Sequence, residues 1–358
     1  MSGEVLPLRL ASLMRKKLKT GRLSILTIGV ILSLVLFTGC TRELIFFPGT
    51  IQEEVDKTID RGFDGTIVYI NRSGTSSFYS AGWKNREKQV PADPHSLFKI
   101  ASISKLYIAA ATTKLIADQS LSLDNTLTEL LPDLAKGIEY SDQITLRMLL
   151  QHRSGIPDFI DAYPWDSPFT DNSDTYTLVM GQPADFRPDK KHKYSNTNYW
   201  LIGEILDRTL SYSHHQYIQN EILHPLRLNN THSLLSEVDI EDVMSGYNKG
   251  YEPDIKGNDF IHPGGSMVAT AEDVGIFLRA LIDGTLFSDD EQAIYSSVYK
   301  YEHTGWLPGY SSIARYHSDI DAVVVQFVNT SSNELFWLQL EQVYNRIVKA
   351  LEKEQSNN

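Results

Sequence analysis

The strand-like segments of this chain lie near its two ends, and helix-like segments fill the long region between them. Alternating, β-branched and aromatic residues occur at 65–70 and 78–83, and again at 310–316 and 322–328, which is the composition of β-strands. One sheet built from both ends, with helices packed on it, is the economical way to bury these apolar faces. We therefore expect an α/β (α+β) fold, with an antiparallel sheet from both chain ends flanked by helices and an all-helical inserted domain at about 120–265.

Apolar residues spaced three or four positions apart predict the helices. Ile51, Val55 and Ile59 form one such stripe, with Gly62 just after it, which predicts an amphipathic helix. The other expected helices begin near Ser102 or span 144–150, 198–210, 212–223, 274–281 and 333–352. Residues 158–188 are rich in Asp, Pro, Ser and aromatic side chains with weak periodicity, and we interpret them as a long surface loop or lid.

The N-terminal residues are typical of an export signal. A basic cluster at 15–19 precedes an apolar run at 23–40 that ends in small residues, in the order that such signals have. The run is near the short limit for a membrane-spanning helix, so an uncleaved anchor is the alternative. A start at Met14 would give a more typical signal than a start at Met1.

Cys40 favours a lipoprotein signal. It is the only cysteine in the chain and follows Thr38-Gly39, a position that resembles the lipidated cysteine of bacterial lipoproteins, although Phe37 stands where leucine is usual. The alternative is a buried structural cysteine. We expect a lipid on Cys40 to hold the protein on the extracytoplasmic face of a bacterial cell membrane. The expected divisions are a signal peptide at 1–39, a tether at 40–48 and the catalytic body at 49–358.

The charge of the chain is unevenly distributed. Its net charge is −12, but residues 1–39 alone carry +5, which leaves −17 on the remainder. Nucleic-acid binding needs a basic surface, and no basic stripe follows the N-terminal segment. We therefore exclude nucleic acid as a partner.

Ser102 and Lys105 lie three residues apart where a helix is expected to begin, so they share a helix face. A lysine whose pKa is lowered by burial can take the proton of a serine hydroxyl, and a helix N-terminus offers N–H groups to an oxyanion. Ser96 and Lys99 have the same spacing but precede the helix and would not share a face. We therefore favour Ser102 as the nucleophile.

Tyr194 and Asn196 are a second candidate group, at the start of another expected helix. Beside a cationic lysine the pKa of a phenol falls, which makes Tyr194 a candidate general base with Lys105 as its partner. An ordinary half-buried aromatic residue is the alternative, because the same pattern also occurs at Tyr69-Ile70-Asn71.

A third group precedes the C-terminal strand pair. Gly305 would let a substrate lie close to a strand edge, and the N–H of Trp306 is a candidate second oxyanion donor beside that of Ser102. His303 would offer a positive or hydrogen-bonding group to a substrate carboxylate. A structural role is the alternative for a lone histidine, and His262 has the same spacing to a glycine with no strand after it.

Together these groups carry a resemblance to a known family. The motifs are Ser102-Ile-Ser-Lys105, Tyr194-Ser-Asn196 and His303-Thr304-Gly305, with further similar segments at 149–158 and 264–273. In order and spacing, from about residue 48 to residue 352, the chain resembles the serine β-lactamase-like superfamily. The branch is the one that holds class C β-lactamases, serine D-alanyl-D-alanine carboxypeptidases and related esterases.

The resemblance implies an α/β domain and a helical domain with acyl-enzyme chemistry in the cleft between them. Ser102 would attack an amide or ester carbonyl with help from Lys105 and Tyr194. Asn196 would bind the acyl-side amide of the substrate, together with the third motif, and water would then release the acyl group.

The third motif, at residues 303–305, distinguishes between the members of the superfamily that this chain could resemble. A class A penicillinase would have an S-D-N box and a lysine where this chain has His303, whereas histidine there is closer to the peptidase and esterase members. Glu302 stands where glycine is frequent in such relatives and would repel a carboxylate.

We expect a serine hydrolase of the cell envelope that acts on a D-alanyl peptide, a β-lactam or an ester. Carboxypeptidases, esterases and β-lactamases share these motifs, so the sequence does not separate them. A catalytically idle ectodomain that senses penicillin or peptidoglycan fragments is the alternative, although intact motifs argue against it. The ten histidines show no H-E-x-x-H or paired ligand spacing, so neither a metal nor a cofactor is expected.

Overall fold

The computed structural model describes residues 49–163, 173–251 and 253–356, which belong to one compact unit, Pro48–Asn358. The expected signal peptide, the tether and Cys40 lie outside the described residues, as does part of the expected lid, and these expectations stay predictions. Within the described part of the chain, no helix is long and apolar enough to cross a membrane.

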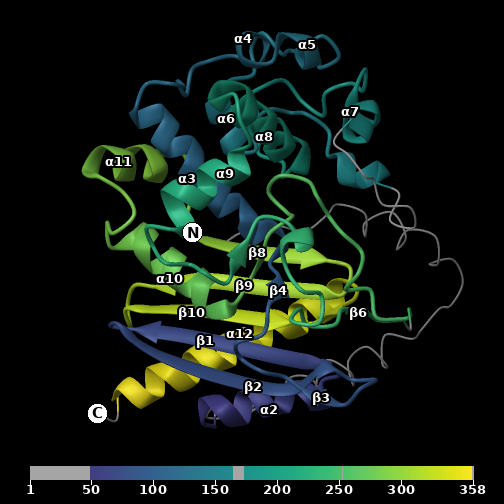
Figure 1. The fold of residues 1–358 in the computed structure, drawn as a ribbon, viewed down its shortest axis with the longest axis vertical. Helices are drawn as coiled ribbons and strands as arrows, with labels where there is room; N and C mark the ends of the chain where they lie inside the picture. Colours follow the sequence, from purple (N-terminus) through teal and green to yellow (C-terminus); the bar gives the residue numbers. More distant parts are fainter. Residues whose placement is uncertain (1–48, 164–172, 252, 357–358) are drawn as a thin grey trace, which may run out of the picture. The chain divides into compact units, whose positions relative to one another are not determined.

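A six-stranded sheet forms the centre of this unit and confirms the expected use of both chain ends (Figure 1). Its strands are β1 (Gly65–Arg72), β2 (Thr75–Asn85), β3 (Val90–Pro91), β8 (Glu302–Leu307), β9 (Tyr310–His317) and β10 (Ala322–Val328). The order is β3-β2-β1-β10-β9-β8, and every neighbouring pair is antiparallel. The N-terminal hairpin therefore pairs with the C-terminal strands through β1 and β10, and β8 is an edge strand.

The two faces of the sheet bury different side chains because successive residues of a strand point in opposite directions. Val68, Ile70 and Val324 pack with α2 (Ile51–Asp60) and α12 (Glu334–Ser356). Ile67 and Val325 belong to a larger core on the opposite face, which includes α10 (Ala271–Ile282) and the helical region. The sheet is thus covered on both faces.

The helical region lies mainly between the two halves of the sheet in sequence. Its helices are α3 (Ser104–Ala117), α4 (Leu127–Leu130), α5 (Pro132–Ala135), α6 (Leu146–Leu150), η3 (Phe159–Ala162), α7 (Ser173–Val179), α8 (Asn196–Leu210), α9 (His214–Ile218), the π-helical turn η4 (Gln219–Leu223) and η5 (Leu235–Glu237). Helix α3 is buried on nearly all sides, as its alanines and threonines permit. Helix α11 (Asp289–Val298), which we did not predict, packs against α3.

Short strands interrupt the region expected to be helical. β5 (Thr231–His232) and β6 (Tyr247–Asn248) fall inside it, β7 (Val268–Ala269) follows it, and β11 (Thr330–Ser331) pairs with β6. A small sheet of order β4-β7-β5 forms where β4 (Phe98–Lys99) leads into Ser102. Two-residue strands show no periodicity, so their existence depends on contacts distant in sequence. This sheet fixes the entry to the Ser102 turn.

Candidate active site

Ser102 lies in a single 3₁₀ turn, η2 (Ala101–Ile103), that leads directly into α3. Ala101 has φ +50°, a left-handed conformation that a β-carbon disfavours. The backbone there is held by Ile100, whose N–H donates to Met267, and by Ser104, whose hydroxyl donates to the Ala101 carbonyl at 2.6 Å. These contacts present Ser102 at the start of the buried helix.

Lys105 is 1% exposed and reaches three acceptors with its amino group. Its Nζ atom lies 3.1 Å from the Ser102 hydroxyl, 2.8 Å from Oδ1 of Asn196 and 2.8 Å from the Gly264 carbonyl. Burial lowers the pKa of Lys105 to about 7, and the negative charge of Asp158 opposes that shift. The amine is therefore about half neutral near pH 7.

The three contacts of Lys105 suit a neutral amine that accepts a proton. A neutral amine has two N–H donors and one lone pair, and the carbonyl oxygens of Asn196 and Gly264 accept hydrogen bonds but cannot donate them. In the charged form the third N–H donates to the Ser102 hydroxyl; in the neutral form, with both N–H groups engaged by Asn196 and Gly264, the lone pair faces that hydroxyl. This arrangement allows Lys105 to take the serine proton.

The Tyr194 hydroxyl lies 2.9 Å from the Ser102 hydroxyl and donates to it. Our expectation that a cationic lysine lowers the pKa of Tyr194 is wrong, because desolvation raises that pKa, and the same burial removes much of the positive charge from Lys105. Tyr194 is therefore a neutral phenol at neutral pH. It can pass a proton to a leaving group, and Lys105 is the better candidate for the general base.

Asn196 is fixed by two partners at the first turn of α8. Its Oδ1 accepts from Lys105, and its Nδ2 donates to Oδ2 of Asp158 at 2.9 Å, while its backbone N–H donates to Oδ1 of the same carboxylate at 3.1 Å. One amide proton of Nδ2 remains for a substrate carbonyl, which is consistent with the predicted binding of the acyl-side amide. That role of Asn196 stays a prediction.

Asp158 and the Gly264 carbonyl are site groups that sequence reasoning did not select. Both lie in segments that resemble the family, at 149–158 and 264–273, and that was their only signal. Burial raises the pKa of Asp158, although its hydrogen bonds oppose the shift. Neither group neighbours Ser102 in the sequence, and only the fold brings them together.

His303 is 8% exposed at the start of β8. Burial lowers its pKa to about 3, with a smaller contribution from Lys105. Of the two roles expected for His303, the positive charge is wrong, since the imidazole is neutral over the physiological range, and the hydrogen-bonding role stays a prediction. Its Nδ1 donates to the Thr304 carbonyl, which leaves Nε2 as a hydrogen-bond acceptor.

Gly305 lies where β8 packs against the Ser102 turn. A β-carbon at this position would collide with the Ile100 carbonyl and with the Ser312 hydroxyl. The role expected for Gly305 at the substrate stays a prediction, but the structure adds a second reason for glycine: β8 must approach the nucleophile's own backbone closely.

The register of β8 places the predicted oxyanion donor on its outer edge. Leu307 and Tyr310 flank a two-residue turn and pair with each other, and hydrogen-bonded and non-bonded pairs alternate along an antiparallel ladder. The N–H of Trp306 therefore points away from β9. That edge is consistent with the proposed oxyanion role, which stays a prediction.

The competing pair does not form a similar centre. Ser96 has a buried hydroxyl without a hydrogen-bond partner among the described residues, and Nζ of Lys99 donates to the Asn258 carbonyl. The structure thus brings Ser102 together with Lys105, Tyr194 and Asn196, and it leaves Ser96 outside any such group.

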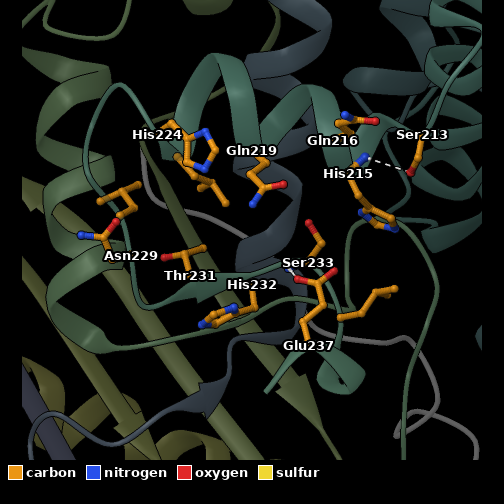
Figure 2. Close-up of a pocket in the computed structure, with 13 residues that line it drawn as sticks. Ser213, His215, Gln216, Gln219, His224, Asn229, Thr231, His232, Ser233 and Glu237 are labelled. Carbon is orange, nitrogen blue, oxygen red and sulfur yellow. Dashed lines mark hydrogen bonds between the residues drawn. The ribbon is translucent and has the colours of Figure 1, made fainter. Parts of the chain in front are cut away.

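A separate cavity of about 640 Å³ lies between the α9–η4 segment and the segment 228–237 (Figure 2). Imidazoles of His215, His224 and His232 face it from both sides with amides such as that of Gln219. In the described ranges no cluster of three or more His, Cys, Asp or Glu residues suits a metal ion. None of the groups around Ser102 lines this cavity.

Comparisons with known proteins agree with this geometry. The family model described as Beta-lactamase matches residues 49–342. The chain is 28% identical over 190 residues to protein flp of Staphylococcus aureus strain N315, covering 50% of this chain and 38% of flp. It is 28% identical over 206 residues to penicillin-binding protein 4* of Bacillus subtilis strain 168, covering 56% of this chain and 44% of that protein. The match thus spans less than half the length of these curated relatives.

A solved structure shows the same fold. The D-amino acid amidase of Ochrobactrum anthropi SV3, in complex with L-phenylalanine amide, superposes with a TM-score of 0.75 at 23% sequence identity. The alignment covers 85% of this chain and 98% of the amidase.

Proposed function

Since the chain belongs to the Beta-lactamase family, whose matching segment spans residues 49–342, we propose that it is a serine hydrolase that forms an acyl-enzyme on Ser102 and cleaves an amide or ester bond. One observation carries the proposal: a serine hydroxyl lies within hydrogen-bond distance of both a buried lysine with a pKa of about 7 and a neutral tyrosine. A structural serine needs neither partner. Together they supply a base for the hydroxyl and a proton for a leaving group.

The chemical steps follow from these positions. The Ser102 oxygen bonds to the substrate carbonyl carbon while its proton moves to the Lys105 amine, and the oxyanion that forms is stabilised by the backbone N–H groups of Ser102 and Trp306. The carbon to leaving-group bond then breaks as Tyr194 passes its proton to the departing nitrogen or oxygen, and Lys105 reprotonates Tyr194. Water then attacks the acyl carbon while Lys105 accepts its proton. The bond from the acyl carbon to the Ser102 oxygen breaks, Lys105 returns the proton to that oxygen, and the carboxylic acid leaves.

For the substrate we propose a D-alanyl-D-alanine peptide or a related amide or ester of a D-amino acid. Support comes from the similarity of the chain to a penicillin-binding protein and to a D-amino acid amidase. Neutral His303 gives no ionic partner for a substrate carboxylate, which favours substrates with a neutral leaving group within that class. Glu302, which we expected to repel a carboxylate, is ion-paired with Lys300 and Arg315.

The proposed location follows from Cys40. A lipid on that cysteine and a tether at 40–48 would place the catalytic unit on the extracytoplasmic face of the cell membrane, where D-amino acid peptides occur in the envelope. Labelling with a radioactive fatty acid, lost in Cys40→Ala, tests this part independently.

The test of the chemistry is intact-protein mass spectrometry of residues 41–358 after exposure to a fluorophosphonate and, separately, to benzylpenicillin. Ser102→Ala is the test variant, and Ser96→Ala is the matched control because it removes the competing hydroxyl. We expect a single adduct in the wild-type protein and in Ser96→Ala, and none in Ser102→Ala.

Turnover then distinguishes the substrate classes. A D-alanyl-D-alanine peptide, D-alanine amide and a p-nitrophenyl ester are compared at equal concentration. An adduct on Ser96 would refute Ser102 as the nucleophile, and no adduct and no turnover with any reagent would refute the enzyme proposal. A penicillin adduct with no turnover of the three substrates would instead support the sensor alternative.

A further inference from the structure

His152 lies directly beneath the tyrosine of the catalytic group, in the loop after α6. Its imidazole is 5% exposed, and its ring centroid is 4.4 Å from that of Tyr194 at an interplanar angle of 30°. The aromatic partners of Tyr194 among the described residues are His152 and His303, and the His303 ring is farther away at 6.3 Å. His152 therefore supplies the closer surface on which the phenol ring rests.

The same residue also holds the backbone that carries Tyr194. Its carbonyl accepts from the N–H of Lys193 at 3.0 Å, and its Nδ1 accepts from the N–H of Ser195 at 3.2 Å. These two donors flank Tyr194 in the sequence. One histidine thus fixes the backbone on both sides of the tyrosine as well as one face of its ring.

The tautomer of His152 is determined by its partners. Nδ1 also lies 3.3 Å from Nδ2 of Asn198, whose Oδ1 accepts from the Ser154 hydroxyl. Both groups that reach Nδ1 are therefore donors, so Nδ1 is an acceptor and the ring proton is on Nε2. Burial, with smaller contributions from Lys105 and His303, lowers the pKa of His152, and the ring stays neutral beside the tyrosine.

The backbone of His152 supports a specific role. It has φ +54°, a left-handed conformation that is uncommon outside glycine, asparagine, aspartate and histidine. Asparagine and glycine fit this turn with less strain, yet neither has a ring to place under Tyr194. An asparagine could also accept from the Ser195 N–H, so the ring itself is needed for the contacts with Tyr194 and, at 5.3 Å, with Tyr199.

We propose that His152 is a positioning residue that holds the Tyr194 hydroxyl against Ser102. This inference rests on the proposed function, and it adds to it a residue that does not touch the reacting atoms. Tyr194 is 37% exposed as a residue, although its hydroxyl is desolvated beside Ser102, so the orientation of the phenol depends on the ring that packs on its buried face. A displacement of about 1 Å at such a group is enough for a loss of about 100-fold.

The test is a double-mutant cycle between His152→Asn and Tyr194→Phe. Asparagine retains the left-handed turn and an acceptor for the Ser195 N–H, and it removes only the ring. The measured quantity is the rate of Ser102 acylation by D-alanine amide, whose departing nitrogen needs a proton from Tyr194, with kcat and KM separated. His192→Asn is the matched control, because that neighbouring ring contacts His152 edge-on at 6.0 Å.

We expect His152→Asn to lower kcat by about 10- to 100-fold with little change in KM, and His192→Asn to act like the wild type. In the Tyr194→Phe background the same substitution should change the rate by less than about twofold, because its effect passes through the missing hydroxyl. Equal losses in both backgrounds, or a wild-type rate in His152→Asn, would overturn the inference.

A crystal structure of His152→Asn tests the inference without activity. The inference expects the Tyr194 hydroxyl to leave hydrogen-bond distance of Ser102, whereas an unchanged contact near 2.9 Å would refute it. If the wild-type protein shows no acylation at all, the proposed function fails, and this distance still decides the role of His152.

Discussion

Acidification through neutrality should switch off acylation of Ser102, because Lys105 then holds the proton that it must accept. Burial lowers the pKa of Lys105 from 10.5 to about 7, a change of about 5 kcal/mol in favour of the neutral amine at 1.36 kcal/mol per pKa unit. At pH 8 about nine tenths of the amine is neutral, compared with well under one hundredth for an ordinary lysine. Burial thus raises the fraction of competent base by more than about 100-fold.

The assay is the second-order rate of Ser102 acylation by a neutral p-nitrophenyl ester from pH 5 to 9. A neutral ester has no titrating group of its own, so the profile reports the free enzyme. We expect a limb with an apparent pKa of about 7, below which the rate falls about tenfold per pH unit. Ser96→Ala should show the same limb.

Two results would contradict this reasoning. A rate that is constant between pH 5.5 and 8.5 would mean that no group near neutrality controls the proton transfer. A limb that rises only near pH 10 would mean that Lys105 keeps its ordinary pKa despite its burial, and the assignment of Lys105 as base would then fail.

Three further predictions follow from other contacts. Tyr194→Phe should lower acylation by D-alanine amide, whose departing nitrogen needs a proton, by about 100- to 10,000-fold, the usual range for loss of a proton-transfer group, while circular dichroism stays unchanged. A loss below tenfold would argue against proton transfer by this phenol. Gly305→Ala should lower acylation because its methyl group meets the Ile100 carbonyl, and a crystal structure should show β8 displaced; wild-type acylation would refute this. Arg346 holds the pKa of Glu54 at about 2, so Glu54→Gln should lower the free energy of unfolding at pH 7 by about 2 kcal/mol. The lowered pKa stabilises the fold only where the carboxyl is ionised, so the difference measured by urea denaturation should shrink as the pH falls from 4.5 towards 2. A difference in the free energy of unfolding that does not change with pH would contradict this prediction.

The sequence predicted the parts of the site that depend on local spacing. Ser102 and Lys105 are neighbours because a helix brings residues three apart together, and the observed separation is 3.1 Å. The sequence also predicted that the N-terminal and C-terminal hairpins form one sheet, since the strand-like segments 65–70 and 322–328 have apolar side chains that must be buried. Asp158 and His152 were not selected, because their contacts with Asn196 and Tyr194 join segments about 40 residues apart.

Two of the errors in the sequence prediction share one physical cause. Both concerned charge: the lowered pKa of Tyr194 assumed a cationic Lys105, and one of the two roles given to His303 assumed a positive imidazole. Spacing shows which residues meet, but the depth of burial decides which of them stays charged. Desolvation instead disfavours every charged form at once, so Lys105 loses its proton more easily, Tyr194 keeps its own and His303 stays neutral.

This common cause also has a consequence for catalysis. A site whose lysine, tyrosine and histidine are all near neutrality attracts no ionic substrate strongly, so binding has to depend on hydrogen bonds to the scissile amide or ester. In the reactive form with a neutral Lys105, the lysine becomes charged only when the Ser102 proton reaches it, as an oxyanion forms opposite. Because two opposite charges in a poorly solvated site attract each other strongly, the arrangement stabilises the transition state more than the bound substrate, which is the condition for a high kcat.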